Sequence, residues 1–177
     1  MCGCLLIIPI AHAQETPAKA ASLPAPRPDD VKSIDGIVAA LYETVSGEKG
    51  HPRDWDRLRS LFAPDARMIL AAPARGEDRP ARLRSMDLET FIKGADANSR
   101  REAFYESEVA RRTDRFGGMA NVWSTYESRI DPKAAPFGKG INSFELFHDG
   151  KRWWVVSVYW TVETADQPIP EKYQSTK

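Results

Sequence analysis

The chain has almost no cysteine, and its charges cancel. The 177 residues include two cysteines, Cys2 and Cys4, both at the amino terminus. The sequence beyond them therefore offers no thiol nucleophile, no disulfide and no cysteine metal site. The 25 basic and 25 acidic side chains give a formal net charge of zero. This balance excludes a global electrostatic field that would attract nucleic acid or an anionic membrane.

Other residues typical of catalysis and metal binding are scarce. After residue 13 the histidines are His51, beside a proline, and His148, in a predicted turn. Two isolated histidines do not form a metal site. The sequence also lacks Gly-x-Ser-x-Gly, a phosphate-binding loop and His-Glu-x-x-His. We therefore predict neither a metal nor a cofactor.

The amino terminus resembles an export signal. The apolar run from Cys2 to Ile10 is far shorter than the about 20 residues that a membrane-spanning helix needs. Ala11-His12-Ala13 supplies the small residues that signal peptidase requires before Gln14. The basic segment of a standard signal peptide is missing, because no Lys or Arg precedes Lys19. We interpret residues 1–13 as a signal peptide and expect a periplasmic or secreted protein.

Composition divides the rest of the chain into three parts. Residues 14–30 contain four prolines and few large apolar side chains, which is typical of a disordered linker. Residues 31–165 are predicted to form one domain, since a chain of this size and 42% hydrophobic content supports one sizeable core. Residues 166–177 are predicted to form a tail.

The domain is predicted to begin with three helices and to end with four strands. Apolar residues at steps of three and four predict a helix over 31–45, capped by Asp29 or Asp30. Further helices are predicted from Asp54 and from Asp87, each of which can cap a helix. The predicted strands cover 104–113, 119–130, 140–147 and 151–162. This order predicts an α+β fold, with three N-terminal helices on the concave face of a strongly curved, mainly antiparallel sheet.

Alternation along the last strand predicts which side chains face the helices. A three-residue turn with Gly150 left-handed would set Phe144 opposite Trp154 and turn Asn142 inward. The even-numbered residues are predicted to be core, and they are Trp154, Val156, Val158, Trp160 and Val162. The outward apolar residues would be Phe147, Trp153, Val155 and Tyr159. Monomers seldom leave such a patch uncovered, so we predict a homodimer through the outer sheet face.

The segment Leu61-Phe62-Ala63-Pro64-Asp65-Ala66 resembles a turn of the nuclear transport factor 2-like (cystatin-like cone) superfamily. The sequences Gly-Ile-Asn-Ser-Phe-Glu-Leu-Phe and Gly-Lys-Arg-Trp-Trp are similar to those of uncharacterised exported bacterial members. The resemblance covers Val31 to Glu163 and implies a cone-shaped fold. It implies no single activity, because the superfamily includes isomerases, dehydratases, epoxide hydrolases, cyclases and binding modules.

Ketosteroid isomerase, a member of this superfamily, uses an aspartate base with a tyrosine and a protonated aspartate as donors. The resemblance places its base at Leu70, which cannot accept a proton. It places the two donors at Tyr42 and Asn142. Isomerisation by that mechanism is therefore not expected.

One pair of acids stands apart from these positions. Glu106, Glu108 and Arg112 share one face of a predicted strand. We interpret them as a cross-strand ion-pair ladder, because paired catalytic acids need surroundings that separate their pKa values.

Our leading hypothesis is a non-catalytic domain that binds a small, mostly apolar or aromatic ligand in a cone-shaped pocket. Tyr42 and Asn142 would supply hydrogen bonds there. The predicted lining residues are Tyr42, Trp55, Leu70, Asn142, Phe144 and Trp160. One alternative is a dehydratase, isomerase or hydrolase with an unidentified base, for which Glu127 is a candidate. Another is a dimeric scaffold without a ligand. An open cavity with a buried carboxylate would favour the enzyme hypothesis. An open cavity without a buried carboxylate would favour the binding hypothesis, and an interior filled by side chains would favour the scaffold hypothesis.

Overall fold

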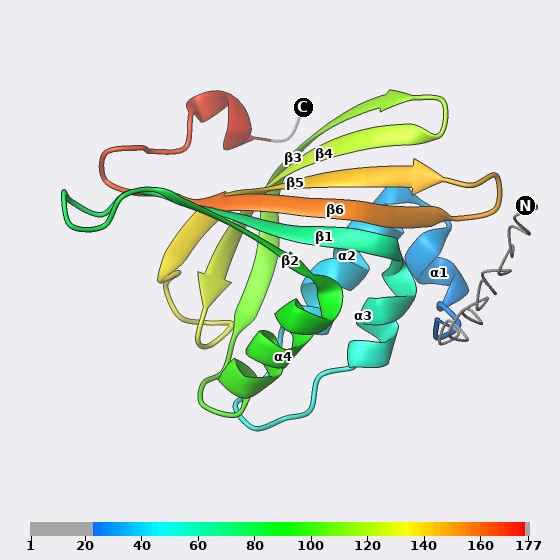
Figure 1. The fold of residues 1–177 in the computed structure, drawn as a ribbon, viewed down its shortest axis with the longest axis horizontal. Helices are drawn as coiled ribbons and strands as arrows, with labels where there is room; N and C mark the ends of the chain where they lie inside the picture. The colour runs from blue at the N-terminus through cyan, green and yellow to red at the C-terminus, as the bar shows by residue number, and fades with distance from the viewer. Residues whose placement is uncertain (1–22, 176–177) are drawn as a thin grey trace, which may run out of the picture.

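A curved six-stranded sheet wraps around four α-helices in the computed structural model, which describes residues 23–175 (Figure 1). The strand order is β2-β1-β6-β5-β4-β3, and every neighbouring pair is antiparallel except β1 and β6. The predicted α+β class is therefore confirmed. The predicted signal peptide lies outside the described residues, as does most of the linker. None of the described helices is long and apolar enough to cross a membrane.

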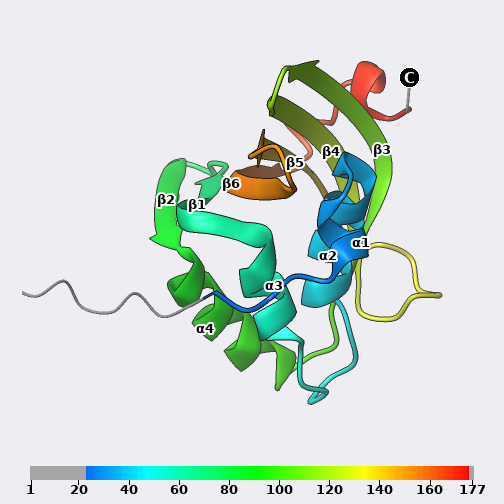
Figure 2. The ribbon, with the colours of Figure 1, turned by 90° about the vertical axis from the view of Figure 1, so that its right-hand side faces the viewer.

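Along the chain, three helices are followed by the β1–β2 hairpin, a fourth helix and four further strands of the same sheet. The helices are α1 (Pro28–Val31), α2 (Ile34–Val45), α3 (Trp55–Leu61), α4 (Leu88–Ser99) and the short 3-10 helix η1 (Glu171–Tyr173). The strands are β1 (Phe62–Ala72), β2 (Arg82–Asp87), β3 (Tyr105–Phe116), β4 (Met119–Arg129), β5 (Gly138–His148) and β6 (Trp153–Val162). In side view, α2 lies against β3, and α4 lies beneath β1 and β2 (Figure 2).

Side-chain caps set the starts of α2, α3 and α4, whereas α1 has none, and the predicted caps Asp29 and Asp30 lie inside α1. The predicted caps of α3 and α4 are present, since Asp54 accepts from the Arg57 amide and Asp87 from the Thr90 amide. The predicted helix over 31–45 is in fact two helices, because Ser33 caps a new start at Ile34. The first helical residue is Pro28, three residues before the predicted domain boundary. Strand β2 was not predicted from the sequence.

A β-bulge at Val156 changes the inward face of β6. Leu146 pairs with Val155, whereas Glu145 pairs with Ser157, so Val156 is the extra residue. Before the bulge the odd-numbered side chains face the core, and Trp153 is 3% exposed and Val155 0%. After the bulge the even-numbered side chains face the core, beginning with Val158.

The prediction that the even-numbered side chains of β6 face the core is therefore wrong before the bulge. Trp154 and Val156 point outward instead of inward, and Phe144 pairs with Val158 instead of Trp154. The predicted conformation of Gly150 is present, with φ of 93°.

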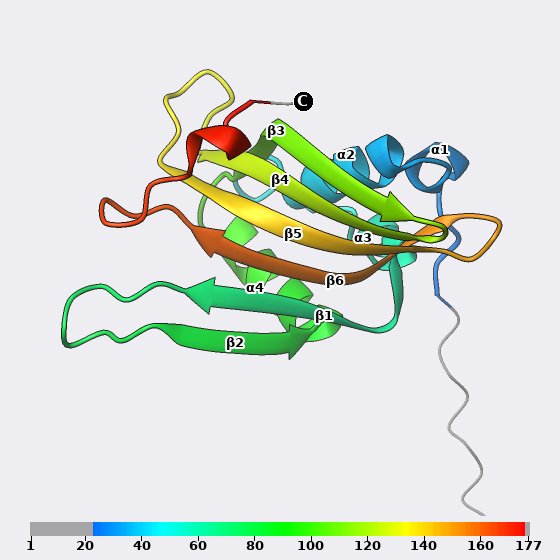
Figure 3. The same ribbon diagram turned by 90° about the horizontal axis from the view of Figure 1, so that it is seen from above.

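The C-terminal segment packs on the outer face of the sheet. Tyr173 of η1 stacks on Trp123 of β4, with ring centroids 5.0 Å apart and planes 17° from parallel. The Thr125 hydroxyl donates to the Tyr173 carbonyl at 2.5 Å, and Ile169 is buried. Seen from above, η1 lies over the β3 and β4 side of the sheet (Figure 3). This part of the predicted tail therefore covers an apolar side chain that would otherwise face solvent.

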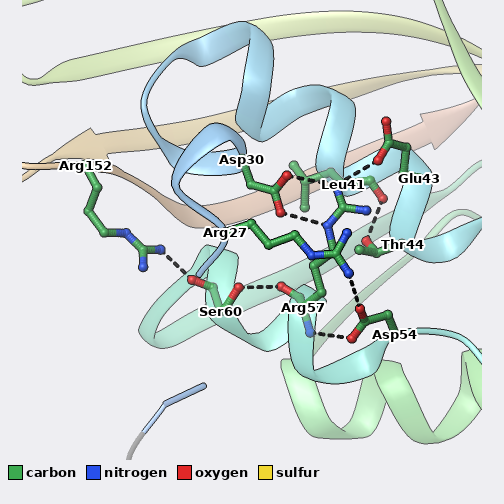
Figure 4. A network of polar contacts seen from close by, with 9 residues as sticks. All are labelled: Arg27, Asp30, Leu41, Glu43, Thr44, Asp54, Arg57, Ser60 and Arg152. Carbon is green, nitrogen blue, oxygen red and sulfur yellow. Dashed lines mark hydrogen bonds and ion pairs between the residues drawn. The ribbon is translucent and has the colours of Figure 1, made fainter. Parts of the chain in front are cut away.

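Arg57 of α3 connects the first three helices (Figure 4). Its guanidinium donates two hydrogen bonds to Asp30 of α1, at 2.7 and 2.8 Å, and one to Glu43 of α2 at 2.7 Å. These carboxylates raise the pKa of Arg57 above its usual value. Because Asp30 is buried, the loss of its partner would leave an uncompensated charge.

We expect Arg57→Met to lower the free energy of unfolding by about 2 to 4 kcal/mol, because it leaves the Asp30 carboxylate buried and unpaired. Urea unfolding followed by circular dichroism measures this change. Arg59→Met is the matched control on the same helix, since its partners Glu89 and Asp56 are exposed, and it should cost less than about 1 kcal/mol. Equal losses from the two substitutions would contradict the role of Arg57.

Candidate functional site

A cavity of about 950 Å³ lies between the helices and the concave face of the sheet. Its volume is at the upper end of the range for sites that enclose drug-sized molecules. Five of the six predicted lining residues lie on its wall, and they are Tyr42, Leu70, Asn142, Phe144 and Trp160. The sixth, Trp55, does not line the cavity. Its indole donates to Asp96 at 3.0 Å and so joins α3 to α4.

Most of the cavity wall is apolar. Met68 and Leu70 from β1 and Met86 from β2 form one side. Phe91 of α4 meets Trp160 edge to face, with ring centroids 6.2 Å apart. Such a surface favours an apolar or aromatic molecule by removing both from water.

The inner end of the cavity is polar because of Glu106 on β3. Its backbone amide donates to the Ser46 hydroxyl at 3.0 Å, and that hydroxyl donates to the Tyr42 carbonyl at 2.7 Å. These bonds fix the start of β3 against the last turn of α2. The sequence predicts Glu106 as part of an ion-pair ladder, whereas the structure places it on the cavity wall. The spacing of Glu106, Glu108 and Arg112 contains no signal for this place, because it does not show the β-bulge at Val109.

A second β-bulge, at Val109, turns Arg112 away from Glu106 and Glu108, the other members of the predicted ladder. Glu108 pairs with Tyr126 and Ala110 with Thr125, so the alternation shifts by one residue. Arg111 then points inward beside Glu108 and donates to it at 2.9 and 2.6 Å. The predicted partner Arg112 lies opposite Trp123 on the outer face. The ladder is thus a pair within one strand, and Arg111 also contacts Asp35.

A chain of hydrogen bonds joins the polar groups at this end. The Asn142 amide donates to the Tyr42 hydroxyl at 3.1 Å, and Ser124 donates to Glu108 at 2.5 Å. Tyr42 and Ser124 are 2.6 Å apart. Ser124 has a single proton and gives it to Glu108, so Tyr42 must donate to Ser124. Tyr42 therefore orients Asn142 and has no proton to offer a ligand.

Glu106 differs from the other acids of the interior in having no cationic partner. Within the described residues, Arg111 pairs with Glu108 and Arg57 with Asp30, but no Lys, Arg or His lies within ion-pair distance of Glu106. Burial raises the pKa of Glu106 to about 7, and a hydrogen bond from Asn142 acts in the opposite direction. Burial also raises the pKa values of Tyr42 and Tyr126, so both are neutral.

Glu127, the carboxylate proposed from the sequence as a base, does not face the cavity. It lies at the opposite surface of β4, between Lys139, at 2.7 Å, and Arg129. The hydrogen bond from Lys139 is the main cause that holds the pKa of Glu127 below its usual value. A paired carboxylate of low pKa is a poor base. Among the described residues, no group of three or more His, Cys, Asp or Glu side chains could hold a metal ion.

Comparison with solved structures shows the fold. The chain is similar to a protein of unknown function with a cystatin-like fold from Nostoc punctiforme, with a TM-score of 0.54, 14% identity, and coverage of 75% of this chain and 90% of that one. It is also similar to the beta subunit of a candidate aromatic-ring-hydroxylating dioxygenase from Novosphingobium aromaticivorans, with a TM-score of 0.52, 16% identity, and coverage of 74% and 87%. A candidate ketosteroid isomerase from Parabacteroides distasonis has a TM-score of 0.50, 10% identity, and coverage of 77% and 98%.

These likenesses confirm the predicted cystatin-like cone fold. No protein-family model matches the chain, and no curated protein matches it. At sequence identities this low, similarity to solved structures shows the fold and does not show the function. The function has to be argued from the cavity of this chain.

The Glu106 carboxyl makes a testable contribution to stability. It stays protonated in the folded protein up to about pH 7, whereas in the unfolded chain it ionises near 4.5. The unfolded state thus binds fewer protons between these values, so folding becomes less favourable as the pH rises. The variant Glu106→Gln cannot ionise at this position. Its free energy of unfolding relative to that of the natural protein should be about 2 to 3 kcal/mol higher at pH 8 than at pH 4.

Urea unfolding of both proteins from pH 4 to pH 8 measures this difference. Glu102→Gln is the control, because Glu102 is exposed at the cavity wall. A stability difference between Glu106→Gln and the natural protein that does not change with pH would show that the pKa of Glu106 is the same in the folded and unfolded states.

Proposed function

We propose that this domain binds a small, mostly apolar molecule in the cone cavity, with the polar end of the molecule toward Glu106 and Asn142. The observation that carries the proposal is the cavity itself, which is open, about 950 Å³ in volume, and mostly apolar. A wall of this kind removes the body of a ligand from water, and a few polar groups fix its orientation. The interior is not filled by its own side chains, which argues against the scaffold hypothesis.

The relatives in structure agree with a ligand-binding cone but do not select a ligand. One is described as a candidate ketosteroid isomerase and another as a subunit of a candidate aromatic-ring-hydroxylating dioxygenase. Those descriptions belong to those proteins. In this chain, Leu70 occupies the position that the resemblance gives to the isomerase base, and it forms part of the apolar wall.

Glu106 favours an enzyme as the second candidate. A carboxylate whose pKa is about 7 is suited to accept and return a proton at neutral pH. In this hypothesis Glu106 replaces Glu127 as the candidate base.

We expect Leu70→Trp to weaken the binding of N-phenyl-1-naphthylamine, an uncharged fluorescent probe, by about tenfold or more, because a larger side chain fills the cavity. Leu83→Trp is the matched control, since Leu83 is exposed on the neighbouring strand, and it should leave binding unchanged. Fluorescence titration measures both, and circular dichroism verifies that each variant is folded.

Two outcomes would count against the binding proposal. One is the absence of saturable binding by the natural protein to any uncharged apolar probe. The other is equal weakening by the two substitutions, which would place the probe outside the cavity.

The predicted homodimer remains a proposal, with a corrected surface. Phe147 and Tyr159 are exposed on the outer face, at 49% and 46%, as predicted, whereas Trp153 and Val155 belong to the core. Val156 joins the exposed set because of its bulge. The C-terminal segment covers another part of the same face, so the surface available for a second copy is smaller than predicted.

We expect the natural protein to sediment as a dimer at micromolar concentration and Tyr159→Glu to sediment as a monomer, because a buried unpaired charge opposes association. Analytical ultracentrifugation measures both masses. Thr113→Glu on exposed β3 is the control and should remain dimeric. A natural protein that is monomeric at this concentration would refute the dimer.

A further inference from the structure

The carboxylate of Glu106 lies in a cavity rich in aromatic side chains, and among the described residues no Lys, Arg or His forms an ion pair with it. The cavity wall contains Phe62, Phe91, Phe104, Tyr126, Phe144 and Trp160. Aromatic ring faces attract cations, and a carboxylate does so more strongly. In other proteins, aromatic cages bind organic ammonium groups.

We propose that the cavity binds an amphiphilic amine, whose protonated nitrogen pairs with Glu106 and whose apolar body lies against the aromatic wall. This inference rests on the proposed function and specifies its class of ligand. A primary or secondary ammonium carries both the charge and the hydrogen-bond donors that Glu106 lacks.

The groups that face Glu106 do not supply this charge themselves. Tyr42 comes from α2, Tyr126 from β4 and Asn142 from β5, and all three are neutral. Glu108, its neighbour on β3, is already balanced by Arg111. A ligand ammonium would therefore meet one unbalanced negative charge.

None of the arginines on the cavity wall forms an ion pair with Glu106 among the described residues. The Arg53 guanidinium donates to four backbone carbonyls, those of Val45, Gly47, Glu48 and His51. Arg84 and Arg101 are exposed. An anionic ligand whose carboxylate faced Glu106 would therefore meet it without a cation between them.

The same geometry gives the direction of the pH dependence. The ammonium pairs with the ionised form of Glu106, so binding must take a proton away from a carboxyl that is half protonated near pH 7. Affinity for an amine should therefore fall as the pH falls. The expected loss is about fivefold between pH 7 and pH 6, and it approaches tenfold per unit below that. An uncharged ligand should show no such loss.

The test compares three probes that share one apolar body and differ in their polar end. They are 2-(2-naphthyl)ethylamine, 2-(2-naphthyl)ethanol and 2-naphthylacetic acid, titrated calorimetrically into the full chain at pH 7.5. We expect the amine to bind at least about tenfold more tightly than the alcohol, and the acid to bind most weakly, because a charged hydrogen bond exceeds a neutral one.

Glu106→Gln should weaken amine binding by about 10-fold to 100-fold and leave the alcohol within about threefold. Glu77→Gln is the control, because Glu77 is exposed and does not line the cavity, and it should leave both affinities within about threefold. If Glu106→Gln does not fold, the pH series on the natural protein tests the same pair without a substitution.

The outcomes separate this inference from the proposed function. Equal affinities for amine and alcohol, or an amine preference that persists in Glu106→Gln, would overturn the amine assignment while the cavity remains a binding site. Binding of none of the three probes would also overturn it. The uncharged probe N-phenyl-1-naphthylamine then decides the proposed function independently.

Discussion

Two β-bulges determine which side chains the sheet turns toward the helices. Alternation along a strand holds only while every residue has a partner, and an extra residue exchanges the two faces from that point on. The bulge at Val156 sends Trp153 and Val155 to the core on one side and Trp160 to the cavity on the other. The bulge at Val109 lets Glu108 and Arg111 point inward together. The apolar wall and the polar end of the cavity both depend on these two residues.

The polar end of the cavity follows from how its charges are balanced. Glu108 uses Arg111 and the Ser124 hydroxyl, and the resulting chain of donors fixes Tyr42 and then Asn142. Each proton in that chain is already assigned to a partner. Glu106 adjoins the chain through Asn142 but receives no cation from it. Among the described residues, Glu106 is therefore the carboxylate of the cavity's polar end that has no cationic partner.

The sequence was sufficient to predict the α+β class, the helices that begin after Asp54 and Asp87, and five residues of the cavity wall. Caps at Asp54 and Asp87 and the inward position of Asn142 depend on local chemistry, which a sequence displays directly. The facing of Trp153 could not be predicted, because the bulge at Val156 is set by pairing with β1 and β5 at once. The alternation of apolar and polar residues along β6 does not predict that pairing.

The role of Glu106 was hidden for the same physical reason. In the sequence, Glu106, Glu108 and Arg112 have the spacing of an ion-pair ladder, and the bulge at Val109 moves the arginine to the other face. Trp55 illustrates a different limit. Its place on α3 was predicted, but its indole turns to Asp96 on α4, a contact between helices that are distant in sequence. Tertiary contacts of this kind lie beyond periodicity arguments.

The two hypotheses for Glu106 make opposite demands on its pKa. A general base at neutral pH must keep a pKa near 7 when the ligand is bound, since a strongly stabilised carboxylate would not hold the proton that it accepts. An ammonium ligand would lower that pKa by supplying the missing positive charge. The pKa of Glu106 in the occupied cavity therefore distinguishes proton transfer from cation binding. The fold is compatible with both, because what differs is the charge that enters with the ligand.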